Sequence, residues 1–260
     1  KKAKIFISNT KEKTIKYEGI RKRDRRNFFK IFQSFFQNFS NQINREFIYF
    51  FKSGLKDNQA IDPFISDLYN KLINPIRASI INYKLSNKYI DKKNLPRIKY
   101  AFFPLHSEPE VSIMLHNKSY INQIEAIRIF SHNLPADMMI IVKDHPVACG
   151  KRSLNYYKKI LDIPNVELVK PSLSTDSIIE NSSIIITVAG SVAFEAILKA
   201  KPVISLGTDH HNILPESMIR LVKSPNMLYE NIKLLLKNYK FNSKALTSYV
   251  AAVMKNSIRI

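Results

Sequence analysis

The sequence of 260 residues contains a single cysteine, Cys149, and no long apolar run. One cysteine excludes an intramolecular disulfide and suits a reducing compartment. A membrane-spanning helix requires roughly 20 consecutive apolar residues, and no segment approaches that length. The first residues also lack the apolar run and small-residue cleavage site of a signal peptide, and the chain begins at Lys1. We therefore expect a cytoplasmic protein, of which this sequence is a portion.

Several motifs of enzyme active sites are absent as well. The sequence has no Walker loop, no Gly-x-Gly-x-x-Gly and no Gly-x-Ser-x-Gly, which disfavours kinase, dehydrogenase and hydrolase functions. It has no His-Glu-x-x-His and no cysteine pair, and His210 and His211 are adjacent, which predicts that their side chains point in different directions. We therefore expect neither a metal nor another cofactor.

Positive charge is abundant and unevenly distributed. The net charge is +20, and residues 1–99 carry 23 Lys and Arg against only 8 Asp and Glu. Phosphate neutralisation would suit a nucleic-acid partner, but no zinc-finger, RNA-recognition or helix-turn-helix signature is present, which disfavours one. Attraction to an anionic membrane surface and an ordinary solvated basic face both remain open.

The segment before Pro96 is predicted to be mainly helical. Aromatic residues recur at spacings of three and four between Phe28 and Phe50, which places them on one helix face. We expect this aromatic face to pack against another domain. Insertion into a lipid interface, beside the basic run at 21–26, is the less favoured alternative. Residues 1–97 are thus expected to form a basic, mainly helical linker or the remnant of an N-terminal domain, with further helical turns at 65–73 and 76–89.

After Pro96, short apolar runs alternate with amphipathic segments. The runs are rich in Ile, Val and Phe, as in strands buried on both faces, and lie at 100–105, 138–142, 166–169, 184–188 and 202–206. Helices are expected at 120–130, 154–161, around 178–179, and at 192–199, 225–239 and 243–255. Alternation of this kind predicts an α/β domain over residues 98–260, with a Rossmann-like parallel sheet and helices on both faces.

Ligands of such sheets bind beyond the carboxyl ends of the strands, so the loops after the strands hold the candidate site residues. The candidates are Glu108, Glu110, Lys143, His145, Pro146, Arg152, Gly190, Ser191 and Glu195. Gly190 lets a phosphate approach the backbone at the start of a helix, whose first amides are free donors. Ser191 is equally suited to cap that helix. Glu195 is placed to accept hydrogen bonds from ribose, or is an ordinary surface glutamate.

The remaining candidates offer proton transfer and positive charge. His145 precedes Pro146, which favours an extended backbone, and its imidazole is suited to donate to a phosphate oxygen or to act as an acid. Lys143 and Arg152 add positive charge. Glu108 and Glu110 offer carboxylates for a general base, although an acidic loop opposite basic residues also suits a structural ion pair.

Taken together, these segments resemble the capsule polysaccharide biosynthesis family of bacteria. The similar segments are KYAFFPLHSEPE at 99–110, VKDHP at 142–146, GSVAFEA at 190–196 and KPV at 201–203, with Arg152 and the pair Tyr156 and Tyr157 between them. They cover about 110 residues in the order that the family shows.

The resemblance implies the C-terminal half of a glycosyltransferase-B architecture, which binds a nucleotide-activated sugar. Relatives in the family include transferases that use CMP-Kdo to build the lipid-linked start of a capsule. On that basis His145 and the Gly190–Ser191 turn hold the nucleotide phosphate, Glu195 holds the ribose, and transfer proceeds without a metal. Glu108 or Glu110 then deprotonates a hydroxyl of a glycan or glycolipid acceptor.

The same resemblance leaves other roles open. The protein is expected at the inner face of the cytoplasmic membrane or free in the cytoplasm. A non-catalytic component of capsule assembly or export, and a nucleotide-sugar epimerase, are the alternative functions.

Overall fold

The computed structural model describes residues 2–12, 73–91, 95–96, 98–107, 120–145, 148 and 151–256. The predicted aromatic face between Phe28 and Phe50 and the basic run at 21–26 lie outside these residues. The chain divides into two compact units, one of residues 1–16, 88–147 and 155–260, the other of residues 17–87 and 148–154. The first unit contains the sheet and the second contains helix α4 (Asn74–Lys84).

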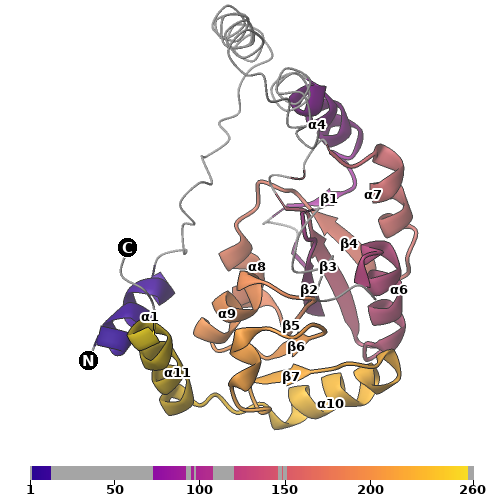
Figure 1. The fold of residues 1–260 in the computed structure, drawn as a ribbon. Helices are drawn as coiled ribbons and strands as arrows, with labels where there is room; N and C mark the ends of the chain where they lie inside the picture. The colour runs from indigo at the N-terminus through magenta and orange to yellow at the C-terminus, as the bar shows by residue number, and fades with distance from the viewer. Residues whose placement is uncertain are drawn as a thin grey trace, which may run out of the picture. The chain divides into compact units, whose positions relative to one another are not determined.

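The described residues of the first unit form a sheet of seven parallel strands (Figure 1). The strands are β1 (Tyr89–Ile90), β2 (Lys99–Pro104), β3 (Met138–Lys143), β4 (Val166–Val169), β5 (Ile184–Thr187), β6 (Val203–Ser205) and β7 (Ile219–Leu221). Their spatial order is β1-β4-β3-β2-β5-β6-β7. From β2 the chain builds outward in one direction to β4, and it then returns to β5 on the other side of β2. The predicted α/β class with a Rossmann-like parallel sheet is confirmed.

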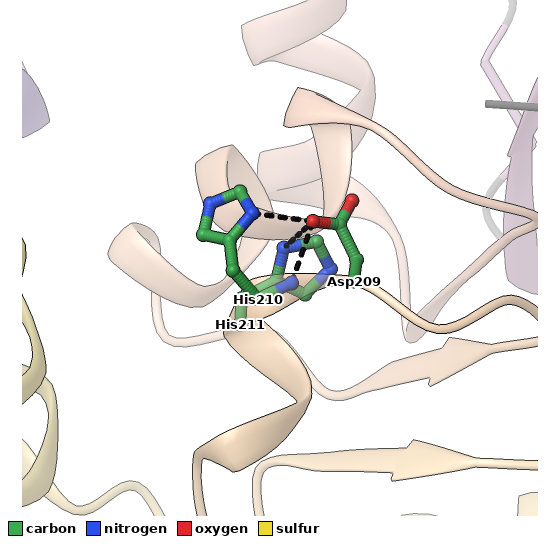
Figure 2. Close-up of side chains that lie close together, drawn as sticks. All are labelled: Asp209, His210 and His211. Atoms are coloured by element: carbon green, nitrogen blue, oxygen red, sulfur yellow. Dashed lines mark hydrogen bonds and ion pairs between the residues drawn. The ribbon is translucent and has the colours of Figure 1, made fainter. Parts of the chain in front are cut away.

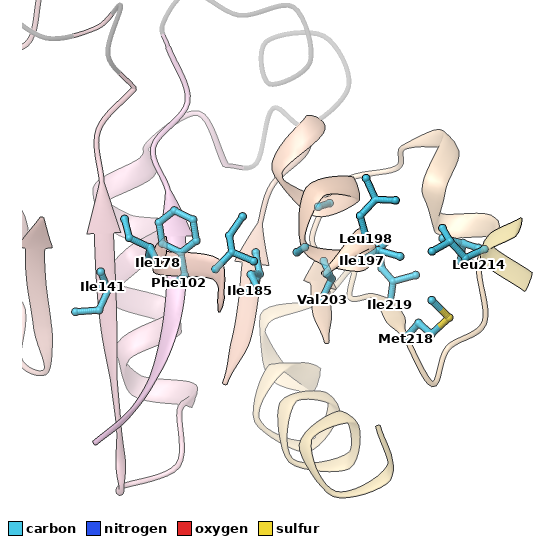
Figure 3. Close-up of a cluster of buried hydrophobic side chains, with 14 of the residues drawn as sticks. Phe102, Ile141, Ile178, Ile185, Ile197, Leu198, Val203, Leu214, Met218 and Ile219 are labelled. Atoms are coloured by element: carbon cyan, nitrogen blue, oxygen red, sulfur yellow. The ribbon is translucent and has the colours of Figure 1, made fainter. Parts of the chain in front are cut away.

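Side chains of the central strands point alternately to the two faces of the sheet, and both faces are buried. Phe102 pairs in register with Ile141 of β3 and Ile185 of β5, and all three belong to the same hydrophobic core (Figure 3). The next residue, Phe103, points to the opposite face and lies 5.2 Å from the ring of Phe130, measured between centroids. This is why the strands are continuous apolar runs rather than alternating ones.

Helices cover the two faces as the right-handed crossovers require. On one side lie α6 (Gln123–Asn133), α7 (Leu154–Leu161) and α10 (Leu228–Asn238), and on the other lie α8 (Thr175–Asn181) and α9 (Ser191–Leu198) (Figure 1). Helix α11 (Ser243–Asn256) adds Leu246 and Val250 to the core beside α9. Short 3₁₀ turns, η4 (His210–Ile213) and η5 (Pro225–Met227), complete the described elements.

The N-terminal helix α1 (Lys2–Glu12) belongs to the unit that contains the sheet. It packs against α11 and α9, and Ala3 is buried in their shared core. The sequence pattern did not connect these residues to the sheet, because the contact joins opposite ends of the chain.

The predicted helix at 76–89 is wrong at its end. Helix α4 stops at Lys84, whereas Tyr89 and Ile90 form a strand that pairs with Leu168 and Val169 of β4. A further hydrogen bond holds this strand, β1, at the edge of the sheet: the Lys170 N–H donates to the Ile90 carbonyl at 3.3 Å. Two residues are too few to show a periodicity, so the pairing partner decides their conformation.

None of the described helices combines the length and apolar character needed to cross a membrane.

Candidate functional site

The direction of strand order reverses between β2 and β5, which are hydrogen-bonded neighbours. The chain leaves β2 toward α6 on one face and leaves β5 toward α9 on the other face (Figure 1). Open α/β sheets bind their ligands at the carboxyl ends of the strands on either side of such a reversal. A ligand is therefore expected at the loops after β2 and β5.

Gly190 lies in the loop after β5, immediately before α9. Its φ is +98° and its ψ is −178°, a backbone conformation that residues with a side chain rarely adopt. A Cβ atom at this position would lie 3.8 Å from Cε1 of His106, which is an ordinary contact distance. The backbone conformation, rather than lack of space, is what requires glycine here, and it brings the loops after β2 and β5 together.

His106 is fixed beside Gly190 by the first residue of α6. The His106 N–H donates to Oε1 of Gln123 at 2.7 Å, and Nε2 of Gln123 donates to the His106 carbonyl at 3.2 Å. Both side chains are buried, at 7% and 1% exposure. Sequence reasoning placed His106 in the segment similar to the family but gave it no role, and its position at the end of β2 is the signal that could have found it.

Asp209 comes from the loop after β6 and contacts the same turn. Its Oδ2 accepts the Gly190 N–H at 3.1 Å, and its Oδ1 accepts the His210 N–H at 2.7 Å. Burial acts to raise the pKa of Asp209, but the charges of His211 and His210 and the two backbone donors outweigh it, so the pKa lies below its usual value. The amide of Gly190 is thus already engaged by an anionic oxygen.

Glu195 lies one turn into α9. Burial raises the pKa of Glu195 to about 7, the Asp176 charge adds to this, and the Ser191 hydroxyl and the charges of Lys199 and Lys143 oppose it. The Ser191 hydroxyl donates to Oε1 of Glu195 at 3.3 Å. The expectation that Ser191 caps α9 is wrong, because the N-cap residue is Gly190 and no side chain caps the helix there.

The loop after β3 is held by a buried carboxylate. Asp144 accepts the Tyr157 hydroxyl at 2.5 Å through Oδ2 and the His145 N–H at 2.8 Å through Oδ1. Tyr157 is on α7, so the bond ties the loop to the helix that follows. His145, which is partly exposed, and Lys143, which is buried, therefore occupy defined places at the carboxyl edge of the sheet.

The structure brings five of the predicted site residues to one edge of the sheet. They are Lys143, His145, Gly190, Ser191 and Glu195. Arg152 is buried in the second compact unit. Glu108, Glu110 and Pro146 lie outside the described residues. The binding and catalytic roles of all of these residues stay predictions.

His210 and His211 were expected to point apart, and this is wrong. Their rings lie 5.3 Å from each other between centroids, and a nitrogen of each approaches the same Oδ1 of Asp209 (Figure 2). The His210 Nδ1 is 2.5 Å from that oxygen and the His211 Nδ1 is 3.7 Å from it. Both rings meet the carboxylate of Asp209, the residue that precedes them and caps η4.

Solved structures with a related arrangement include transferases and epimerases. The KpsC beta Kdo 2,4 transferase of Thermosulfurimonas dismutans is 15% identical, with 76% of this chain and 58% of that chain covered at a TM-score of 0.43. The UDP-GlcNAc 2-epimerase of Methanocaldococcus jannaschii, in complex with UDP-GlcNAc and UDP, is 17% identical, with 84% and 59% covered at 0.41. The S. aureus MnaA structure with UDP is 11% identical, with 67% and 52% covered at 0.40.

The present chain thus spans between half and three fifths of the length of these structures. Their TM-scores are low, and the fold assignment depends on the strand order of the sheet itself. No curated protein shows significant sequence similarity to the chain. The capsule polysaccharide biosynthesis protein family matches residues 63–214, which is more than half of the sequence and includes the loops after β2, β3, β5 and β6. The chain therefore belongs to the capsule polysaccharide biosynthesis protein family.

Proposed function

We propose that the chain binds a nucleotide-activated sugar at the carboxyl ends of β2, β3 and β5, and that the protein transfers this sugar to a glycan or lipid-linked acceptor. The observation that carries the proposal is the position of Gly190 at the reversal of strand order, with its backbone N–H directed at an anionic oxygen of Asp209. An amide N–H that already donates to a carboxylate oxygen is also suited to donate to the oxygen of a phosphate.

Charge around this amide is arranged for an anionic nucleotide. Lys143 is buried at the end of β3, and its positive charge acts on Glu195, so the two side chains lie within electrostatic reach of each other. We infer that Lys143 and His145 compensate the phosphate charge while the α9 amides donate to its oxygens. On departure of the sugar, these groups stabilise the negative charge left on the nucleotide.

Glu195 is suited to the ribose. Near neutral pH its carboxyl group is partly protonated, so it can donate one hydrogen bond and accept another from a diol. The acceptor hydroxyl needs a base, for which we propose Glu108, with Glu110 as the alternative, in direct transfer that uses no metal. CMP-Kdo is the donor that we propose first, because the family includes transferases of this kind.

A donor screen is the decisive first experiment. CMP-, UDP- and GDP-sugars are added to the 260-residue chain, and the shift of its unfolding temperature is measured, with the free sugars as controls. A ligand that binds only the folded state raises that temperature in proportion to its concentration over Kd. We expect one class of nucleotide to stabilise the chain, and no shift with any of the three would contradict the proposed site.

Activity is tested on the full-length protein with the donor that the screen selects. A transferase releases free nucleotide only when an acceptor is present, whereas an epimerase converts the donor without an acceptor. A non-catalytic assembly or export component releases nothing. Membrane attachment at the inner face of the cytoplasmic membrane is a separate proposal, tested by salt-sensitive binding of the full-length protein to anionic vesicles.

A further inference from the structure

The loop after β6 gathers one carboxylate and two imidazoles within a small volume (Figure 2). Asp209, His210 and His211 each offer one ligand atom, and these atoms all lie within 4.8 Å of one another. Among the residues that the structure describes, this is the group with the composition and spacing of a metal centre. Nothing in the proposed sugar transfer uses the two histidines.

His211 supplies an independent reason to expect a ligand. Its side chain is 1% exposed, yet neither of its ring nitrogens makes a hydrogen bond. Its Nδ1 faces Oδ1 of Asp209 at 3.7 Å, which is too long for a hydrogen bond. Buried polar atoms are nearly always satisfied, so an imidazole held in this way points to a partner that the protein itself does not provide.

We propose that Asp209, His210 and His211 form a binding site for a divalent transition-metal ion, with Zn²⁺ as the expected occupant. Imidazole nitrogens suit Zn²⁺, whereas Mg²⁺ and Ca²⁺ prefer sets made only of oxygen atoms. Three protein ligands leave a fourth position for water, as in the open class of zinc sites. The inference rests on the geometry of this loop, and it shares only the Asp209 carboxylate with the proposed donor site.

The distances fit such an ion after a small adjustment. In a tetrahedral site with bonds of about 2.0 Å, neighbouring ligand atoms lie about 3.3 Å apart. The two distances to Oδ1 of Asp209, 2.5 Å for His210 and 3.7 Å for His211, fall on either side of that value. His210 is the side chain that must move, and it is free to do so because 70% of it is exposed.

Protons balance when the ion enters. The Nδ1 of His210 now faces a carboxylate oxygen and carries the proton between them, so coordination through Nδ1 requires this proton to move to Nε2 or to solvent. The Asp209 Oδ2 keeps its bond from the Gly190 N–H, so Asp209 still links the loop after β6 to the start of α9 when its Oδ1 binds the ion.

The test measures Zn²⁺ binding to the untagged 260-residue chain, first freed of metal with a chelator. Calorimetry gives the stoichiometry, and the unfolding temperature with and without Zn²⁺ gives a second readout. We expect one tight site per chain and a higher unfolding temperature with Zn²⁺. His210→Ala and Asp209→Asn should each weaken Zn²⁺ binding by about tenfold or more. Mutation of residues that only hydrogen-bond to metal ligands already lowers metal affinity by about tenfold or more.

His132→Ala is the matched control, because it removes an imidazole from the exposed surface of α6. It should bind Zn²⁺ as the unchanged chain does. Absorption of the Co²⁺-loaded chain distinguishes this site from one at Cys149, since only a thiolate ligand adds a sulfur-to-metal charge-transfer band. The proposal fails if the chain binds no Zn²⁺, if His210→Ala and Asp209→Asn both bind it as tightly as the unchanged chain, or if the Co²⁺ spectrum shows a thiolate. Equal stabilisation by Mg²⁺ would also overturn it.

Discussion

The carboxylate of Asp209 accepts the backbone N–H of Gly190 at 3.1 Å, across a separation of 19 residues in the sequence. The bond joins the loop after β6 to the first turn of α9, at the reversal of strand order. A donor phosphate bound to the same amide must displace the carboxylate or share the amide with it. We therefore expect the affinity for the proposed donor to depend on the charge of Asp209.

Asp209→Asn should tighten the binding of a nucleotide sugar by about three- to tenfold. The amide oxygen of Asn still accepts the Gly190 N–H, but it no longer repels an incoming phosphate. The free energy of unfolding should fall by about 1 kcal/mol, because a charge-assisted hydrogen bond becomes a neutral one. Calorimetric titration with the donor, without added metal, measures the affinity.

Asp162→Asn is the control for that variant, since it removes the same charge from an exposed position after α7. Its donor affinity should equal that of the unchanged chain. Weaker donor binding by Asp209→Asn would show that the carboxylate assists the nucleotide instead of competing with it.

Gly190→Ala should destabilise the fold by about 1–3 kcal/mol, even without any ligand. The residue has a φ of +98°, which strains any residue with a side chain, although the space beside His106 admits a Cβ. The free energy of unfolding from denaturant titration measures this, and Ser191→Ala is the control because it changes a neighbouring residue with helical backbone. Equal stability of the Gly190→Ala variant and the unchanged chain would contradict the assigned conformation.

Glu195→Gln should stabilise the protein at pH 8, and this stabilisation should be much smaller at pH 5. Burial raises the pKa of Glu195 to about 7 in the folded state, against 4.5 as its ordinary value. The folded state thus holds its proton more tightly than the unfolded state, and stability is lost as pH rises from about 4.5 through 7. Gln is neutral at every pH and avoids this loss, which we put at about 1–3 kcal/mol.

Unfolding by denaturant at several pH values between 5 and 8 tests that linkage. Glu167→Gln, on β4, is a comparison variant for the loss of a carboxylate elsewhere in the sheet. The free energies of unfolding of Glu195→Gln and the unchanged chain are compared at each pH. If their difference does not change with pH, the carboxyl group of Glu195 titrates normally.

His145→Ala should weaken donor binding by about ten- to a hundredfold with little effect on the fold. The change removes one charge-assisted donor to the phosphate, of about 1.5–3 kcal/mol. The loop itself is held by Asp144 through its bonds from Tyr157 and the His145 backbone, which the substitution leaves in place. Titration with the donor is the measurement, and His132→Ala serves as the control. An unchanged affinity would remove His145 from the proposed site.

Glu108→Gln in the full-length protein should lower kcat by about a hundredfold or more with donor affinity little changed. A general base acts on the chemical step and not on ground-state binding. Steady-state kinetics and donor titration separate the two effects. Normal turnover would assign the base to Glu110 or to another residue.

Local sequence was sufficient for the strands and helices around the site. Runs such as 138–142 and 166–169 predicted β3 and β4 within one residue at each end, because strands buried on both faces must be apolar throughout. Parallel strands also place every strand-end loop at one edge, so Lys143, His145 and Gly190 could be grouped before their positions were known. The resemblance to the capsule polysaccharide biosynthesis family, which rests on the same loops, is confirmed by the match over residues 63–214.

Tertiary structure alone decided which of those loops meet, and how. The strand order places His106 beside Gly190, and the Asp209 carboxylate reaches the same turn from a loop two elements away. Strand β1 is two residues long and is defined by its partner in β4, while α1 is placed by its contact with α11. Periodicity reports only on neighbours along the chain, whereas these features depend on pairing and burial between residues far apart in sequence. The two adjacent histidines are a different case, because they meet at the carboxylate of their own neighbour, Asp209, and residue spacing alone did not show that contact.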